Sequence, residues 1–322
     1  MEDKQEQTIE KYSFHVKNRY RARGAMILDT DEGLCLMREY EKINQHFVLE
    51  NRIKDHLFSQ GMVLTDRVIE NRDGEKITQW ESGEKYIVYQ WYSGDSCDYK
   101  KTEDLAKAAQ NLGKLHKNLQ NMSQTKQRPE ESLADQYKRY NKELKRIYQF
   151  MKSKKRKNSF ELCAISCFRE FYEKAEKARE ELEQSPFVRK YEEGSADLCH
   201  GAYNYHNLIF TKQGIATTNF ECARYGIQLL DLAYFLRKVM EKNKWQTDKG
   251  EIILKKYAEQ MTCREEHRQF LKTILSYPVK YRKLMNQYMN GKKSWISDKN
   301  MEKLLAVQEM EEEKENFLRN IM

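Results

Sequence analysis

Residues 198–207 hold the side chains whose types and spacing could do chemistry. They read Leu-Cys-His-Gly-Ala-Tyr-Asn-Tyr-His-Asn, so His200 is followed by a glycine and, seven residues on, by Asn207. This spacing is typical of a phosphoryl-transfer loop, where an aspartate two residues after the histidine accepts the proton of the attacking hydroxyl. Position 202 is Ala202, which has no side-chain acceptor. The segment therefore predicts a catalytic loop without its acid/base group.

Three further segments occur in an order that makes this interpretation more specific. Residues 112–116 read Leu-Gly-Lys-Leu-His, residues 218–221 read Thr-Asn-Phe-Glu, and residues 231–233 read Asp-Leu-Ala. Together with the loop they resemble the L-x-x-L-H, I-D-F/W-E, D-L-A and H-G-D-x-x-x-x-N motifs of the aminoglycoside/choline phosphotransferase family. The resemblance implies an α+β, two-lobe protein-kinase-like fold, with a small antiparallel-sheet lobe followed by a larger, mainly helical lobe.

The same resemblance implies roles for single residues. His200 and Asp231 would hold the backbone of the loop, while Asn207 would either ligate Mg²⁺ or brace the loop through its amide. Asn219 stands where the family has the aspartate that holds the metal, and Glu221 could point to the same side of an extended strand. Mg²⁺ favours carboxylate and phosphate oxygens, so a site of Asn207, Asn219 and Glu221 predicts weak metal binding.

The first lobe would supply the nucleotide site. Arg38 falls where a strand would present the phosphate-binding lysine, and Glu50 is its candidate partner on the next helix. Trp91 and Tyr92 lie where the hinge would meet an adenine, although aromatic residues there could simply pack the lobes together. No G-x-G-x-x-G loop occurs, and residues 18–24 instead hold three arginines that either bind an anion or form a solvated hairpin.

A closer resemblance covers nearly the whole chain. The matching segments are residues 23–25, 36–40, 219–221, 225–228 and 231–238, with Tyr277, Pro278 and Trp295. They look like segments of the CotS family of bacterial spore coat proteins, which is kinase-like in fold and belongs to endospore formers. This resemblance implies cytoplasmic synthesis, a place in the spore coat, and other coat proteins as partners.

The patterns around these segments predict the elements that position them. Residues 47–61 have helical spacing that ends at Gly61, and an Asp/Gly turn separates two apolar runs of a hairpin. The predicted strands before residue 92 are residues 12–16, 25–28, 34–37, 67–70 and 86–89. A helix is expected from Thr102, long charged helices over residues 133–183, strands at 208–210 and 215–217, and a helix over 229–240. The predicted lobes are residues 1–92 and 93–322.

Composition excludes some classes of protein. The net charge is +8, but the basic residues are dispersed among acidic ones apart from residues 152–157, where a solvated loop is favoured over a docking patch. No nucleic acid is therefore expected as a partner. No apolar run reaches the ~18–20 residues that span a bilayer, so no membrane contact is expected either.

The cysteines favour a reducing compartment. Seven occur, without C-x-x-C pairs, in a chain that lacks the basic and apolar start of a secretory signal. Cys199 and His206 flank the loop and invite Cys/His chemistry, but Cys199 ends a predicted strand and core packing is favoured. The residues 309–315, rich in glutamate, are expected to form a solvated helix face.

Two functions remain open from the sequence. The favoured one is a catalytically deficient pseudokinase of the spore coat that acts by binding and assembly, with ATP and Mg²⁺ bound weakly or not at all. The alternative is an active ATP-dependent small-molecule phosphotransferase that uses Glu221 and another base.

Overall fold

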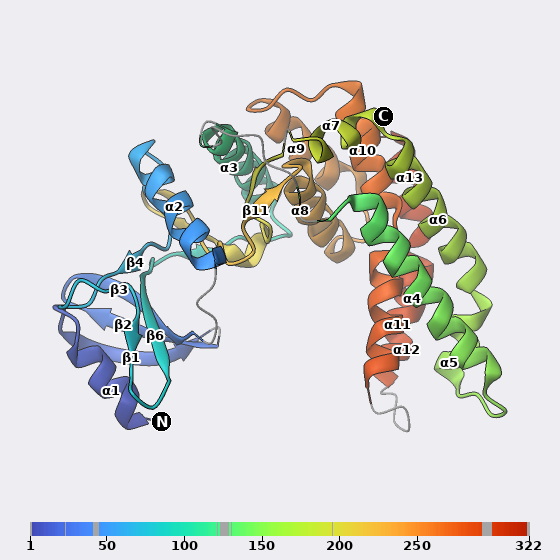
Figure 1. The fold of residues 1–322 in the computed structure, drawn as a ribbon. Helices are drawn as coiled ribbons and strands as arrows, with labels where there is room; N and C mark the ends of the chain where they lie inside the picture. The colour runs from blue at the N-terminus through green and yellow to red at the C-terminus, as the bar shows by residue number, and fades with distance from the viewer. Residues whose placement is uncertain are drawn as a thin grey trace. The chain divides into compact units, whose positions relative to one another are not determined.

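The computed structural model describes residues 2–22, 24–40, 45–120, 122, 129, 131–194, 196–291 and 298–320. The chain divides into one unit of Met1–Gln124 with Leu198–Arg224 and another of Thr125–Asp197 with Tyr225–Met322. An antiparallel sheet comes first and a mainly helical part follows, which confirms the predicted kinase-like α+β class (Figure 1). Helix α3 (Thr102–Gln120) falls in the first unit rather than the second, so the lobe boundary at residue 92 stays a prediction.

The main sheet of the first unit is antiparallel throughout its described strands. Its order is β1-β2-β3-β6-β4, with β5 also paired to β6. The strands are β1 (Val16–Ala22), β2 (Ala25–Thr30), β3 (Gly33–Glu39), β4 (Val68–Ile69), β5 (Thr78–Gln79) and β6 (Lys85–Gln90). The predicted hairpin is confirmed, because Thr30 pairs with Gly33, whose φ of 119° suits a residue without a side chain.

The segment before this sheet differs from the prediction. Helix α1 (Glu2–Glu10) precedes β1, and the expected strand over residues 12–16 is a turn for most of its length. Tyr12 and Phe14 are nevertheless buried, in a core cluster with Leu28, Met37 and Val88 of the sheet. The apolar residues at positions 12 and 14 therefore reflect contact with the core from an irregular segment, and they do not indicate a paired strand.

Two helices of the first unit follow their sequence signals. Helix α2 (Gln45–Ser59) stops before Gly61, whose φ is 81°, and it buries Glu50, Ile53, Lys54 and Leu57 on one face. The amphipathic α3 begins at the predicted capping segment. A three-stranded sheet of β7 (Asp95–Ser96), β9 (Leu208–Thr211) and β10 (Gly214–Thr217) completes the unit, together with β8 (Asp197–Cys199) and the 3₁₀ turn η1 (Tyr205–Asn207).

The second unit is built from helices whose apolar faces pack on one another. They are α4 (Leu133–Ser153), α5 (Ser159–Ser166), α6 (Phe168–Gln184), α7 (Pro186–Glu192), α8 (Leu229–Lys242), α9 (Thr247–Ala258), α10 (Glu265–Ser276), α11 (Val279–Asn290), α12 (Asp298–Glu309) and α13 (Glu311–Asn320), after the short strand β11 (Arg224–Gly226). Helix α4 packs along α6 and α11, and α12 packs on α5 and α11 (Figure 1). Stacked rings such as Phe171 on Tyr281, 4.5 Å apart, join these helices.

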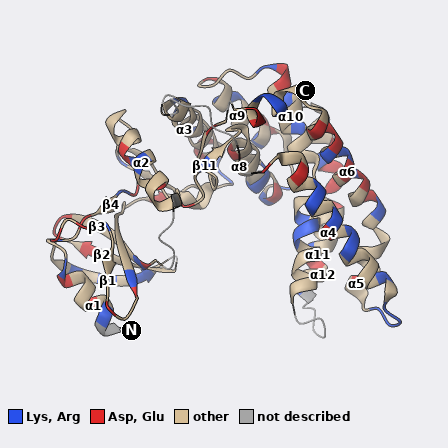
Figure 2. Ribbon diagram, in the orientation of Figure 1, with Lys and Arg blue, Asp and Glu red and all other residues tan. Residues whose placement is uncertain are grey.

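The lysine-rich segment of residues 152–157 includes the last two residues of α4 and most of the connection from α4 to α5 (Figure 2). Two of its lysines are used within the fold, since Lys154 forms an ion pair with Glu161 and the Lys157 ammonium donates to the Lys154 carbonyl at 2.6 Å. Asn158 and Glu161 then cap α5 reciprocally in a capping box. These bonds anchor the connection at the start of α5.

The glutamate-rich tail is not entirely solvated, so that prediction is wrong for Glu311. This residue is 9 % exposed, and its carboxylate lies 3.0 Å from the Lys174 ammonium and 3.4 Å from that of Lys314. Lys174 belongs to α6, and Lys314 belongs to α13 itself. Burial between two cations explains why an acidic run can lie partly inside the unit.

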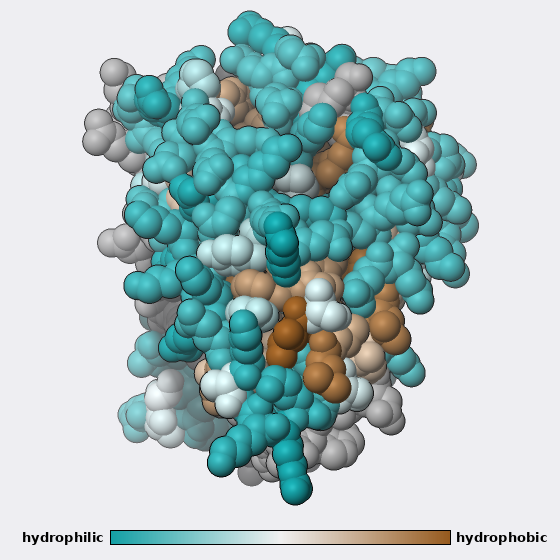
Figure 3. All heavy atoms as spheres, turned by 90° about the vertical axis from the view of Figure 1, so that its right-hand side faces the viewer, coloured by the Kyte–Doolittle hydropathy of each residue, from teal (hydrophilic) through white to brown (hydrophobic). Residues whose placement is uncertain are grey.

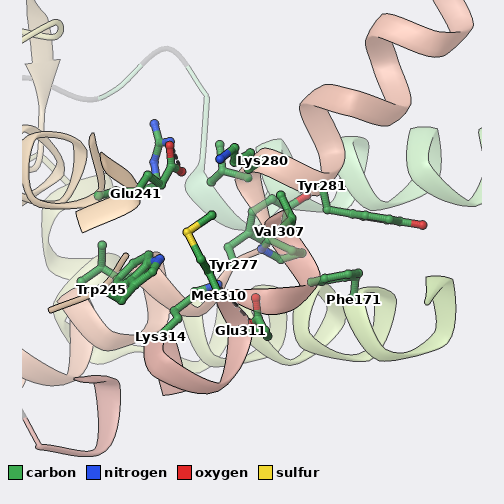
Figure 4. Close-up of a pocket in the computed structure, with 14 residues that line it drawn as sticks. Phe171, Glu241, Trp245, Tyr277, Lys280, Tyr281, Val307, Met310, Glu311 and Lys314 are labelled. Carbon is green, nitrogen blue, oxygen red and sulfur yellow. Dashed lines mark hydrogen bonds and ion pairs between the residues drawn. The ribbon is translucent and has the colours of Figure 1, made fainter. Parts of the chain in front are cut away.

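A pocket in the second unit lies beside this ion pair (Figure 4). Trp245, Tyr277, Phe171 and Met310 line it together with Glu311 and Lys314, and the Lys314 ammonium donates to the Ser276 carbonyl at 3.1 Å. Its volume of about 30 Å³ holds roughly one water molecule. This pocket is too small for a nucleotide or a sugar.

One face of the second unit carries an apolar area among hydrophilic residues (Figure 3). Leu162 of α5 is 57 % exposed and Leu305 of α12 is 42 % exposed, and the two helices pack together. No helix in the described part of the chain is long and apolar enough to cross a membrane.

The buried Glu161 carboxylate gives a test of how the helical unit is held together. Its side chain accepts hydrogen bonds from the Tyr288 hydroxyl at 2.6 Å and the Asn158 backbone at 3.0 Å. We expect Glu161→Gln to lower the free energy of unfolding by about 1–3 kcal/mol in urea titrations, because bonds to a charged acceptor are lost. Glu173→Gln, which breaks an exposed pair with Arg169, should leave the urea midpoint unchanged.

The same carboxylate predicts a pH dependence. Burial raises the pKa of Glu161, but Lys154, Tyr288 and Asn158 together hold it below its ordinary value. A lowered folded-state pKa gives stability that is present above the unfolded value of about 4.3 and is lost as the pH falls through the folded value. The stability difference between the wild type and Glu161→Gln should therefore shrink below about pH 4. A difference that grows on acidification would contradict this assignment.

Candidate functional site

The loop after β8 keeps its shape through a buried histidine. The His200 Nδ1 accepts from the Ala202 backbone N–H at 3.2 Å, so the ring proton is on Nε2, which donates to the Thr218 carbonyl at 3.1 Å. His200 is fully buried and its ring lies 4.4 Å from that of Phe220. Through these two bonds the histidine connects the loop to the segment that holds Thr218.

Two amides complete the brace from the far end of the loop. The side-chain amides of Asn204 and Asn207 both donate to the Ala202 carbonyl, at 2.8 and 2.9 Å. The Asn207 carbonyl in turn accepts from the backbone N–H of Thr218 at 2.9 Å. These bonds use the backbone of Ala202, so they form without any side-chain acceptor at this position. The loop can therefore be held in shape with an alanine at position 202.

The glycine of the loop is required by its surroundings. Gly201 has a φ of 79°, and a Cβ placed there would lie 1.9 Å from the carbonyl oxygen of Cys222. That distance is far below van der Waals contact, and the neighbour is backbone and cannot rotate away. Gly201 is thus fixed both by its backbone conformation and by close approach of the segment after Asn219.

Asn219 occupies an uncommon backbone conformation. Its φ is 66°, in the left-handed region, which asparagine tolerates better than most residues. The backbone N–H of Asn219 donates to the Asp66 Oδ2 at 2.9 Å, while its own Oδ1 is buried without a hydrogen-bond partner. Such strain persists only where surrounding contacts enforce it, and here Asp66 supplies one of those contacts.

Arg38 does not pair with Glu50. Its guanidinium donates to the Tyr89 hydroxyl at 3.1 Å and forms an ion pair with Glu221. Glu221, the proposed substitute metal ligand, is therefore already engaged by a cation. The expected phosphate-binding arginine and the expected metal ligand neutralise each other.

Glu50 instead pairs with Lys54, one turn further along α2. The Lys54 ammonium lies 2.5 Å from the Glu50 Oε1 and 2.9 Å from the Asp66 Oδ1. The side chains of Glu50 and Lys54 are both 1 % exposed. Burial raises the pKa of Glu50, and the ammonium of Lys54 opposes that shift.

Lys54 and Asp66 are site residues that the sequence interpretation missed. The i,i+4 spacing of Glu50 and Lys54 is visible in the sequence and could have suggested the pair. The contact with Asp66 could not be found in that way, because Asp66 lies twelve residues after Lys54, in a loop outside the helix.

The hinge aromatics have structural partners in the first unit. The Tyr92 hydroxyl donates to the Thr65 carbonyl at 2.7 Å, and burial raises the pKa of Tyr92 to about 12. The backbone N–H of Trp91 donates to the Leu34 carbonyl at 2.8 Å, and its ring packs against the sheet cluster that includes Leu36 and Tyr89. Their role toward an adenine stays a prediction.

The arginine hairpin is only partly described. Arg19 pairs with Glu6 of α1 at 2.5 Å, and Arg21 is exposed. Arg23 lies outside the described residues, as does Trp295 of the spore coat resemblance. No anion site is assigned to this hairpin.

Three of the four remaining residues are buried, and His206 is exposed. His116 of α3 and Cys199 of β8 are buried, the latter as the core residue that was favoured. His206 is exposed in η1, with its backbone bonded to the Asn204 side chain at 2.8 Å. Asp231 is buried at the start of α8 in the second unit, and its expected tie to the loop stays a prediction.

The donor set does not fit a Mg²⁺ ion. Asn207 and Asn219 offer neutral amides, and the carboxylate of Glu221 is paired with Arg38. Among the described residues no group of three His, Cys, Asp or Glu side chains is placed to hold a metal. Mg²⁺ seldom leaves its water shell for neutral ligands alone, so a metal-bridged nucleotide would lack its usual protein anchor.

Comparison with known proteins identifies the fold of this arrangement. A structure of an aminoglycoside phosphotransferase from Alicyclobacillus acidocaldarius superposes with a TM-score of 0.84 at 16 % identity, over 97 % of this chain and 93 % of that one. An aminopropanol kinase associated with a microcompartment gives 0.63 at 13 % identity, over 100 % and 98 %. The spectinomycin phosphotransferase bound to ADP and its antibiotic gives 0.64 at 12 %, over 99 % and 98 %. The TM-scores show a shared fold, and sequence identities this low show no shared activity.

A family model gives the more specific match. The family described as "Spore coat putative kinase YutH" matches residues 5–321. No curated protein matches the chain.

Gly201 provides a test of the loop geometry. We expect Gly201→Ala to lower the free energy of unfolding by more than about 2 kcal/mol, since it combines left-handed strain with a clash against the Cys222 carbonyl. Gly24→Ala is the matched control, because Gly24 has a similar φ of 73° but nothing within 4 Å of its Cβ position. The control should cost about 1–2 kcal/mol from backbone strain alone. Equal losses in the two variants would show that Cys222 does not press on the loop.

Proposed function

This chain belongs to the YutH family of spore coat proteins, and on that premise we propose that it is a catalytically deficient kinase-fold protein that acts in the coat by binding and assembly. Its partners in this proposal are other spore coat proteins. The resemblance to the CotS family supports the same place in the spore, and it stays a resemblance.

The observation that carries this proposal is the joint loss of two carboxylates from a loop that is otherwise intact. Ala202 replaces the general base, whose help is worth about 10²–10⁴ in rate. Asn219 replaces the metal-binding charge, while His200, Asn207 and Gly201 still hold the backbone in place. One missing carboxylate could be compensated by a neighbour. Two missing carboxylates remove both the proton acceptor and the anchor for the metal.

Nucleotide binding is expected to be weak and independent of metal. Two structures of the same fold contain ADP or AMP-PNP, the latter together with Ca²⁺, and this supports a nucleotide site in this fold. In this chain the guanidinium of Arg38 is held by Tyr89 and Glu221. A phosphate group would have to compete with the Glu221 carboxylate for that cation.

The alternative function is an active small-molecule phosphotransferase. The buried, unbonded Oδ1 of Asn219 favours it, because such an atom is an acceptor that a ligand or ion could satisfy. This alternative needs Glu221 to leave Arg38 and needs a base other than residue 202.

The first test is phosphoryl transfer itself. We expect purified protein to show no ATP hydrolysis, autophosphorylation or aminoglycoside phosphorylation above the level of the Asn207→Ala variant, with Mg²⁺ or Mn²⁺ present. The physical reason is that position 202 lacks a proton acceptor. The proposal fails if a metal-dependent transfer is measured in the wild type and Asn207→Ala abolishes it.

The second test separates the two roles of Glu221. If this carboxylate serves Arg38, Glu221→Gln should strengthen AMP-PNP binding, measured by thermal shift, to the same extent with Mg²⁺ or with EDTA. If the carboxylate is a metal ligand, the substitution should instead remove a shift that requires Mg²⁺. Glu241→Gln is the control, because it also removes one carboxylate that pairs with an arginine, Arg237, 2.7 Å away in the second unit. It should not change the AMP-PNP response.

A further inference from the structure

The first unit contains a position built for a cation, and a lysine of the same chain occupies it. The Lys54 ammonium lies 2.5 Å from the Glu50 Oε1 and 2.9 Å from the Asp66 Oδ1. It also lies 4.7 Å from the ring centre of Tyr89 and 5.7 Å from that of Phe220, whose π-faces attract cations. All five side chains are buried.

Three acceptor atoms of Glu50, Asp66 and Asn219 are buried without a hydrogen-bond partner. They are the Glu50 Oε2, the Asn219 Oδ1 and the Asp66 Oδ1, the last of which still lies 2.9 Å from the Lys54 ammonium in an ion pair. Glu50 and Asp66 supply two carboxyl groups against the one ammonium of Lys54, and Arg38 also acts electrostatically on Glu50. The three-residue cluster of Glu50, Lys54 and Asp66 therefore has more carboxyl oxygens than the lysine pairs with, and carboxyl oxygens are the ligands that a divalent cation favours.

The cluster also holds the backbone of Asn219, the residue for which the family resemblance predicts a metal-binding role. Asp66 uses Oδ1 for Lys54 and Oδ2 for the backbone N–H of Asn219, 2.9 Å away. The ion pair with Lys54 holds the Asp66 carboxylate in place, and Asp66 in turn holds the left-handed turn at Asn219 through its hydrogen bond to the backbone N–H. The shape of this turn thus depends on a cation supplied by α2.

We propose that Lys54 is a built-in cation that supplies, from within the chain, the positive charge at this site, so that the fold is held without a divalent metal. This inference rests on the proposed function, since it explains how the loop and the Asn219 turn keep their shape when no metal-binding carboxylate is present. It goes further by predicting that removal of Lys54 creates a divalent-cation site from Glu50 and Asp66.

Lys54 also borders a polar pocket. Lys54 lines a pocket of about 300 Å³ between α2 and β4, together with Asn51, Asp55, Arg67, Val68, Glu70 and Lys76. Truncation of the lysine would open the buried carboxylates to this polar pocket. A hydrated metal ion could then reach them without unfolding the unit.

The test is the response of Lys54→Ala to Mn²⁺. Without metal we expect the melting temperature to fall by about 10 °C, because two buried carboxylates lose their counter-ion. Millimolar Mn²⁺ should raise the melting temperature of the variant by about 3 °C or more, whereas the wild type should not respond. The added substitution Glu50→Gln should abolish the response of Lys54→Ala.

Two controls separate a built cation site from packing. Lys107→Ala removes the lysine of an exposed i,i+4 ion pair on α3, in which the Lys107 ammonium lies 2.7 Å from the Glu103 carboxylate. This variant should create no response to Mn²⁺. Lys54→Arg keeps a cation and should remain insensitive to the metal. If Lys54→Ala is insoluble, Lys54→Met is expressed with and without Mn²⁺, and a soluble yield that depends on the metal supports the proposal.

The results that overturn this proposal differ from those that overturn the proposed function. A Lys54→Ala or Lys54→Met protein that is stable and indifferent to Mn²⁺ shows that Lys54 only fills space. A wild type that Mg²⁺ stabilises through Glu50 shows that the position is not filled by the lysine. Phosphoryl transfer by the wild type that needs Asn207 defeats the proposed function, and the Mn²⁺ response of Lys54→Ala can still stand.

Discussion

The ion cluster of Glu50, Lys54 and Asp66 is the constraint on which the first unit depends. It joins α2 to the segment before β4 and, through Asp66, to the turn at Asn219. A buried ammonium is costly unless several acceptors surround it, so each member needs the others. This mutual dependence explains how one helix can hold a backbone turn that lies far away in the sequence.

The loop after β8 is held by hydrogen bonds that need no particular side chain at position 202. The bonds that hold it run from His200, Asn204 and Asn207 to backbone atoms of Ala202 and Thr218. Such bonds are indifferent to the side chain at position 202. The backbone of this loop can therefore be held whether or not position 202 carries an acid/base group.

Local signals predicted much of the fold, and long-range contacts account for the errors. The hairpin that ends at Gly33 and the helix that stops before Gly61 follow from turn and cap chemistry. Tyr12 and Glu311 were misplaced because their environment comes from elements distant in sequence, the sheet in one case and Lys174 in the other. A short alternation or a charge run does not record what packs against it.

The sequence by itself determined which functional groups exist: no carboxylate stands at position 202 or 219, and the order of the motifs indicates a kinase-like fold. Only the tertiary structure decided how the charges pair. Glu50 pairs with Lys54, which also pairs with Asp66, and Arg38 pairs with Glu221 rather than with Glu50. The physical reason is that ion pairing depends on distances of a few ångströms between side chains from separate elements, which folding sets and residue spacing does not.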